Sequence, residues 1–331
     1  FALDRNEEAL AAYEQAILLN PAEASFHRNK SLVFAWLERY EESLSACEQA
    51  ILLDPQKASF HQDKGDTLVQ RTNYREAVAA YEQAILLDPE DASFHASKGV
   101  ALSELGRYDE ALSAYERALL LKPMEASYYR SKGAVLFRTG RSEEALEAVG
   151  QALLLDPTNA LFHLNKGDVL YALRDYEKAR EAFEQSTLLD PQCARAHASK
   201  GHAFFCLGNY DEALEAFEQA ILLEPKKVEH YGIYSTTLCQ LMRYDEALEA
   251  AKQAILLDPT AIRCVNLCVM IAIEAAKQVI LLDPNLPSAR DCKENAHKGL
   301  ESVQKRLAQA EHDIAQILRE THTEQVLSKA Q

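Results

Sequence analysis

Apolar residues fall along this chain in short helical stripes that recur with a fixed period. From Ala92 to Pro123, apolar side chains lie three or four positions apart on either side of Gly106. This spacing predicts two amphipathic helices, because residues three or four apart share one face of a helix. Gly106 suits the left-handed residue that ends a helix, and Pro123 cannot continue the second helix.

The same pattern returns with a 34-residue period through most of the chain. Each copy closes with Leu-Leu-x-Pro, and the spacing shortens only at the last of these tetrapeptides, which ends at Pro284. The prolines on the regular period are Pro21, Pro55, Pro89, Pro123, Pro157, Pro191, Pro225 and Pro259. A fixed period of this length indicates stacked helical repeats, each burying its apolar face against its neighbours. We therefore predict an all-α solenoid, a class that presents long binding surfaces.

Small residues recur where paired helices must approach closely. Alanine stands at the twelfth and fifth positions before nearly every proline, with Ser43 and Ser186 as exceptions. Glycine holds the matching place in the first helix, as Gly65, Gly99, Gly133, Gly167 and Gly201. A bulky residue at these crossings would overpack the helix pair by about 1–3 kcal/mol.

The repeat resembles the tetratricopeptide repeat, a 34-residue helix–turn–helix unit with small residues at the crossing, a tyrosine in the turn and a closing proline. The turn tyrosine is present as Tyr40, Tyr74, Tyr108, Tyr176, Tyr210 and Tyr244. The resemblance implies a right-handed superhelix whose first helices line a concave groove. It also implies protein binding and scaffolding, without naming a ligand.

On this basis we divide the chain into four parts. Residues 1–23 are interpreted as a half repeat with the second helix only, and residues 24–259 as seven full repeats. Residues 260–284 form a shortened, degenerate repeat. Residues 285–331 form one long C-terminal helix with an apolar seam, which either caps the last repeat or forms a coiled coil for dimerisation or docking.

Charge and cysteine content narrow the class of partner. The formal net charge is −16, and the acidic surplus lies in the repeats. Such a surface repels phosphate, so nucleic acid and anionic membranes are not expected partners. Seven cysteines without a CxxC pair indicate reduced thiols, and with no signal peptide they predict a cytoplasmic protein. Cys264 and Cys268 are one helical turn apart but lack further ligands, so no metal site is expected.

Catalytic signatures are missing from the sequence. It contains no glycine-rich phosphate loop, no nucleophile elbow and no HExxH motif. We therefore predict no enzymatic activity and no cofactor.

Three residue types recur at single positions of the repeat and have competing interpretations. Histidines near the start of the first helix are predicted to pack in the core, because stacked helices lie about 10 Å apart, too far for shared metal coordination. Lysines three positions further on are expected to pack their aliphatic chains along the helix interface and to pair with carboxylates. Alternatively, they bind an anionic ligand. Leucines three positions before each proline are predicted to pack on the aromatic residue that follows eight positions later; otherwise they form an exposed apolar stripe for a partner.

The members of these three sets are as follows. The histidines are His27, His61, His95, His163 and His197. The lysines are Lys30, Lys64, Lys98, Lys132, Lys166 and Lys200. The leucines, which we call the leucine row, are Leu18, Leu52, Leu86, Leu120, Leu154, Leu188, Leu222 and Leu256.

The groove implied by the resemblance supplies the best candidate site. Four positions of each first helix face inward by resemblance, and aromatic residues occupy the third of them in three successive repeats, as Phe137, Tyr171 and Phe205. Aromatic rings with a few polar groups suit the anchoring of a peptide, although such rings also pack against neighbouring helices. We predict a partner-binding site, called the inner row below, of Arg130, Phe137, Arg138, Asp168, Tyr171, His202 and Phe205.

Two functions remain open at this stage. The leading hypothesis is a non-catalytic adaptor that binds a peptide segment of a protein partner in the concave groove. The second is a sensor or regulatory arm of a larger enzyme (a kinase, a protease or a nucleotide-hydrolysing switch) whose catalytic domain precedes Phe1, because the chain begins in mid-repeat. Self-association through the C-terminal helix or the leucine row is a further expectation.

Overall fold

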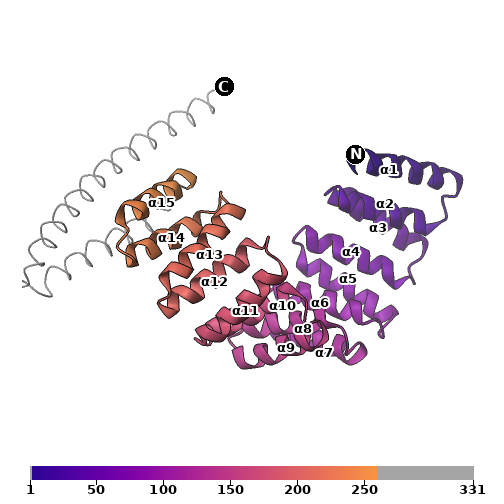
Figure 1. Cartoon of the computed structure of the whole chain (residues 1–331). Helices are drawn as coiled ribbons and strands as arrows, with labels where there is room; N and C mark the ends of the chain where they lie inside the picture. The colour runs from indigo at the N-terminus through magenta and orange to yellow at the C-terminus, as the bar shows by residue number, and fades with distance from the viewer. Residues whose placement is uncertain (1, 259–331) are drawn as a thin grey trace, which may run out of the picture. The chain divides into compact units, whose positions relative to one another are not determined.

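The chain folds into α-helices joined by short turns (Figure 1), in a computed structural model that describes residues 2–258. This range holds fifteen helices and no β-strand. The helices are α1 (Ala2–Leu19), α2 (Ala24–Trp36), α3 (Tyr40–Leu53), α4 (Ala58–Gln70), α5 (Tyr74–Leu87), α6 (Ala92–Glu104), α7 (Tyr108–Leu121), α8 (Ala126–Arg138), α9 (Ser142–Leu155), α10 (Ala160–Ala172), α11 (Tyr176–Leu189), α12 (Ala194–Leu207), α13 (Tyr210–Leu223), α14 (Val228–Gln240) and α15 (Tyr244–Leu257). The predicted all-α helical-repeat solenoid is confirmed.

Several sequence predictions concern residues beyond this range. The degenerate repeat at residues 260–284, the long helix at residues 285–331 and the cysteine pair Cys264 and Cys268 all lie outside the described residues. The division of the chain into a half repeat and seven full repeats stays an interpretation of the sequence period.

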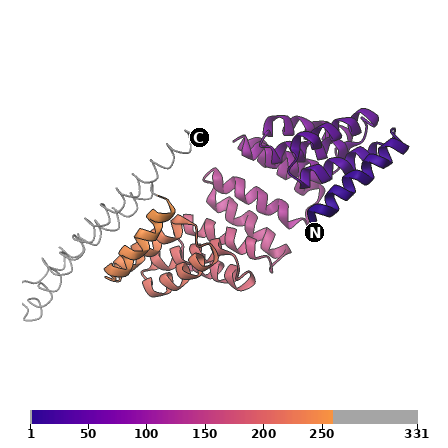
Figure 2. The same cartoon turned by 90° about the horizontal axis from the view of Figure 1, so that it is seen from above.

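Helices follow one another in pairs, which we describe unit by unit. The chain divides into two compact units, residues 1–169 and residues 170–331, with the boundary inside α10. In the first unit, α2 packs on α3, α4 on α5, α6 on α7 and α8 on α9, and each pair packs on the next (Figures 1 and 2). In the second unit α12 pairs with α13 and α14 with α15. We call the first helix of each pair the A-helix and the second the B-helix.

Glycine on an A-helix faces a large ring on its B-helix. A Cβ atom added at Gly65 would lie 2.5 Å from Cε1 of Tyr81, and one at Gly201 would lie 2.7 Å from Cε1 of Phe217. Both rings are buried, so neither can withdraw into solvent. The predicted close crossings are confirmed, and the alanines on the B-helices are fully buried there, as at Ala77, Ala111, Ala145, Ala179 and Ala213.

The turn inside each pair requires one left-handed residue. Three of these are glycines with φ of 73° to 82°, namely Gly106, Gly140 and Gly208. The other four have φ of 58° to 62° without being glycine, namely Glu38, Thr72, Arg174 and Met242. A left-handed residue with a side chain costs about 1–2 kcal/mol. Packing of the helix pair therefore imposes the turn even where the local sequence disfavours it.

Candidate functional site

Neighbouring A-helices touch one another, so their side chains meet across one repeat. In the first unit α2 contacts α4, α4 contacts α6, and α6 contacts α8. Arg28 Nε donates to Asp63 Oδ2 at 2.6 Å, a bond that joins α2 to α4. These contacts make the A-helices a continuous surface within the first unit, on which the inner-row residues of α8 stand.

Three inner-row residues stand on α8 in the first unit. Phe137 is 36% exposed although it is aromatic, and Arg138 beside it is half exposed. Arg138 Nη1 donates to Glu104 Oε1 of α6 at 2.9 Å. Arg130 is half-buried and donates to Ser131 Oγ at 3.2 Å. This surface therefore offers a partly open ring next to Arg138, whose guanidinium is held by a carboxylate.

Asp168, the fourth predicted residue of the first unit, lies on α10 and is half-buried.

The remaining inner-row residues form a contiguous aromatic group in the second unit. The rings of Tyr171 and His202 lie edge to face with centroids 6.5 Å apart, and His202 meets Phe217 at 5.3 Å. Burial lowers the pKa of His202, which keeps its ring neutral at pH 7. Phe205 packs against Tyr210 with centroids 5.4 Å apart.

Cys206 also belongs to this group, although the sequence analysis did not include it in the inner row. Its Sγ lies 3.2 Å from the hydroxyl oxygen of Tyr171. Burial and this thiol raise the pKa of Tyr171. The signal was available in the sequence, because Cys206 directly follows Phe205, at the last of the four inner positions of its repeat. The structure brings Tyr171 and His202 of the row into contact, and the action of the row as one site stays a prediction.

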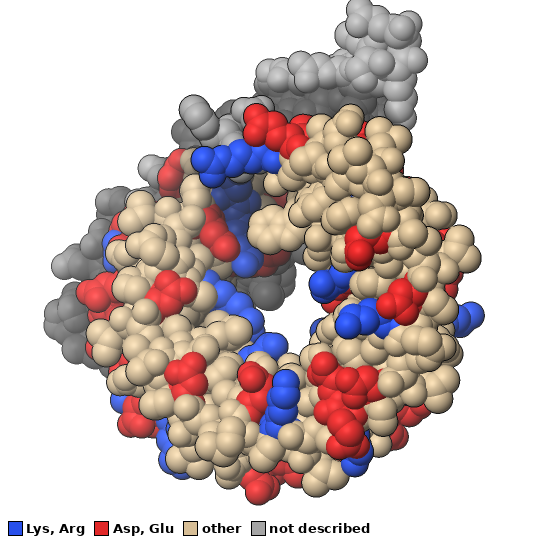
Figure 3. Space-filling model, turned by 90° about the vertical axis from the view of Figure 1, so that its right-hand side faces the viewer, with Lys and Arg blue, Asp and Glu red and all other residues tan. Residues whose placement is uncertain are grey.

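Lysines of the A-helices pair with glutamates of the preceding B-helix. Four such pairs join residues sixteen apart with nitrogen–oxygen distances of 2.7–2.9 Å: Lys30–Glu14, Lys64–Glu48, Lys98–Glu82 and Lys132–Glu116. The expected pairing with repeat carboxylates is confirmed for these four. Figure 3 shows the mixed surface that results, with acidic and basic side chains side by side at several places.

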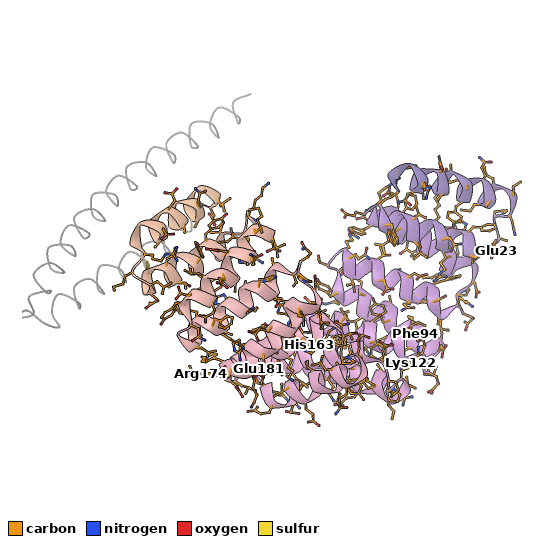
Figure 4. All side chains as sticks on the ribbon, viewed as in Figure 1. Glu23, Phe94, Lys122, His163, Arg174 and Glu181 are labelled. Carbon is orange, nitrogen blue, oxygen red and sulfur yellow. The ribbon has the colours of Figure 1, made fainter. Side chains whose placement is uncertain are left out.

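The repeated histidines do not pack in the core, so that prediction is wrong. All five are half-buried. Four of them donate from Nε2 to the carbonyl oxygen of the proline six positions earlier, as His163 does to Pro157 at 2.9 Å. Figure 4 labels His163 on the ribbon. The bond gives a partner to a backbone carbonyl in the turn between two helices. Tyr231 does the same with its hydroxyl to Pro225 at 3.1 Å, which explains why tyrosine can replace histidine here.

The leucine row is exposed, so the prediction that it packs on the following aromatic residues is wrong. Its seven described members are 71–76% exposed, and the side chain of Leu256 lies outside the described ones. Phe60 packs instead against Ala50 and Ile51 of α3. Leu52 is two positions beyond Ala50 and so projects about 200° further round the helix. An apolar stripe on the B-helices therefore faces solvent.

One member of the leucine row borders a pocket in the second unit. The pocket has a volume of about 460 Å³ between α13, α14 and α15. We call this site the outer pocket. It is lined by Glu218, Ile221, Leu222, Tyr231, Tyr234, Glu246, Glu249, Ala250 and Gln253. Tyr234 donates from its hydroxyl to Glu218 Oε1 at 2.8 Å, and burial together with this bond raises the pKa of Tyr234 to about 12. The sequence analysis did not find this site.

The helix pairs, their crossings and their turns define a helical-repeat protein of the kind that displays surfaces to partners. A family model of the tetratricopeptide repeat matches residues 1–58, 63–119, 98–160, 164–228 and 199–262. These matches span most of the chain, which therefore belongs to the tetratricopeptide repeat family. Proteins of this family generally mediate protein–protein interactions as non-catalytic scaffolds. No described helix has the length and apolar character that a membrane crossing needs.

Solved structures share the fold at low sequence identity. Pseudomonas aeruginosa PilF is 22% identical with a TM-score of 0.53, over 68% of this chain and 96% of its own. Yeast Tom70 is 16% identical with a TM-score of 0.58, over 87% of this chain and 62% of its own. Cut9–Hcn1 of the APC/C is 18% identical with a TM-score of 0.60, over 80% of this chain and 52% of that one. No curated protein matches the chain.

Proposed function

We propose that this chain is a non-catalytic scaffold that binds a peptide segment of a protein partner along the inner row. The observation that carries the proposal is the partly open ring of Phe137, which stands beside the half-exposed guanidinium of Arg138. A well-packed core would bury such a ring. Aromatic and arginine side chains dominate the binding energy of protein interfaces, because they bury large areas and pair with polar groups at their edges.

The polar groups of the row favour a peptide over an apolar small molecule. In the second unit, Tyr171 and Cys206 present a hydroxyl and a thiol, and neutral His202 presents a ring nitrogen that can donate or accept. In the first unit, Arg138 holds Glu104 and leaves further donors on its guanidinium. Such a mixture suits the backbone carbonyls, amides and side chains of an extended or helical segment.

The test is a pull-down from native lysate with the chain and a triple variant, Phe137→Glu, Tyr171→Glu and Phe205→Glu. A matched control places the same three charges on the leucine row, by Leu86→Glu, Leu120→Glu and Leu188→Glu. Both variants must keep the helical circular-dichroism spectrum of the parent chain. A partner that the parent and the control capture, and the inner-row variant loses, supports the proposal. Equal capture by all three, or loss only with the control, contradicts it.

A further inference from the structure

At the outer pocket, a tyrosine replaces a lysine that other repeats carry. In four repeats an A-helix lysine reaches the glutamate of the preceding B-helix, as Lys132 reaches Glu116 at 2.9 Å. The corresponding pair in the last described repeat is Tyr234 and Glu218. Here the tyrosine hydroxyl binds the carboxylate, and no ammonium group is among the described residues that line the pocket. The other repeats thus show that an ammonium group can bind the glutamate equivalent to Glu218.

The lining combines the three elements that hold a basic side chain. Glu218, Glu246 and Glu249 supply carboxylates, of which Glu246 is held through both oxygens by Arg243, at 2.8 and 2.7 Å. Tyr231 and Tyr234 supply aromatic rings, which attract cations through their negative faces. Ile221 and Leu222 supply an apolar wall for methylene groups.

The size of the site and its surroundings point to a partner that is larger than one amino acid. A volume of about 460 Å³ lies within the usual range for ligand pockets, about 300–1,000 Å³. Leu222 at the pocket wall is 72% exposed, so an apolar residue next to the basic one has a surface to cover. The net charge of −16 adds a long-range attraction for a basic segment.

We infer that the outer pocket binds a Lys or Arg side chain of a protein partner, next to the glutamate whose counterpart pairs with the chain's own lysine in four other repeats. The basic head group meets Glu218, its stem lies on Leu222, and the rings of Tyr231 and Tyr234 flank it. The pocket is lined by residues of α13, α14 and α15, and none of them belongs to the inner row. It therefore provides a second contact, whose failure in a test leaves the inner-row proposal unaffected.

The experiment titrates the full chain with N-acetyl-L-arginine amide and, separately, with neutral N-acetyl-L-citrulline amide of the same length. The readout is the NMR shift of the methyl groups of Ile221 and Leu222, with Leu120 as reference in a repeat that keeps its lysine. We expect the arginine amide to shift the two pocket methyls with saturation at a Kd of about 1–10 mM, since a single side chain makes few contacts. Citrulline amide should bind at least ten-fold more weakly.

Three variants make the test specific. Tyr234→Lys restores the lysine of the other repeats, so it should fill the site and abolish the response to arginine amide. Tyr231→His replaces one of the two flanking phenol rings by the histidine common in other repeats and should weaken the response. Glu218→Gln removes one exposed carboxylate without changing the fold, and should weaken binding at least three-fold. Equal responses to arginine and citrulline amides, an unchanged response in Tyr234→Lys, or no saturating shift in the parent chain would each overturn the inference.

Discussion

Replacing glycine by alanine should change stability in opposite directions at two helix positions of this chain. At Gly65 the new Cβ atom would lie 2.5–2.8 Å from three ring atoms of Tyr81. That ring is 1% exposed, and its hydroxyl is fixed by a 2.6 Å bond to Asp66 Oδ1, so it has no room to move. At Gly150, inside α9, the added atom would meet nothing within 4 Å.

The magnitudes follow from overpacking and helix propensity. Overpacking a tight core costs about 1–3 kcal/mol, and three contacts below 3 Å place Gly65→Ala in the upper part of that range. Alanine recovers about 0.5–1 kcal/mol relative to glycine within a helix. We therefore expect Gly65→Ala to lose about 1–2 kcal/mol and Gly150→Ala to gain about 0.5–1 kcal/mol.

Urea unfolding followed by circular dichroism at 222 nm measures both changes as shifts in the midpoint at constant slope. Gly99→Ala is the graded control, because its Cβ would lie 2.9 Å from Tyr115 and should cost less than the change at Gly65. Tyr81→Leu in the Gly65→Ala background removes the ring and should convert the alanine into a neutral or stabilising change. Equal midpoints for Gly65→Ala and Gly150→Ala would refute the reasoning from close crossings.

Three further predictions concern a turn, the leucine row and pH. Thr72→Gly should raise stability by about 0.5–1 kcal/mol in the same urea assay, because it relieves a β-branched residue at φ 62°. Leu86→Gln should change stability by less than about 0.5 kcal/mol and reduce any self-association in sedimentation velocity, whereas buried Leu102→Ala should cost about 2–5 kcal/mol. Burial lowers the pKa of His202 in the folded chain below 6.5. As the pH falls through 6.5, the unfolded chain therefore takes up this proton more readily than the folded chain, and the folded chain loses stability. His202→Phe should therefore show a smaller drop in urea midpoint between pH 7.5 and pH 5.5 than the parent chain.

The fold could be predicted because it depends on residues that lie close together in the sequence. The helix pairs, the left-handed turn at Gly106 and the close crossings at Gly65 depend on residues within one or two repeats of each other. The fixed period repeats those rules along the chain, so any single weak signal is corrected by the other copies. Even a turn with Thr72 in place of glycine adopts the common conformation, because the helix pair on either side fixes it.

The surface was harder to predict, because it depends on which way a side chain projects from a packed helix. The leucine row was predicted to pack because an aromatic residue follows it eight positions later in several repeats. The position of the alanines on the B-helices could have shown that the leucines are exposed. Ala50 is fully buried, and Leu52, two positions later, projects from the other side of α3. For the outer pocket, the signal was the exchange of lysine for Tyr234, but its consequence needs the relative positions of three helices.

The exchange at Tyr234 shows how a nearly uniform repeat can acquire a distinct site. At Gly65 the crossing cannot vary alone, because a single methyl group there would collide with the buried ring of Tyr81. The lysine–glutamate pairs can vary, because exposed ion pairs contribute only about 0–1 kcal/mol each. Replacing one of these lysines therefore leaves the fold intact and changes the surface it once covered. Differences between repeats in partner recognition should accordingly concentrate at such positions, and at Tyr234 such a change coincides with a pocket.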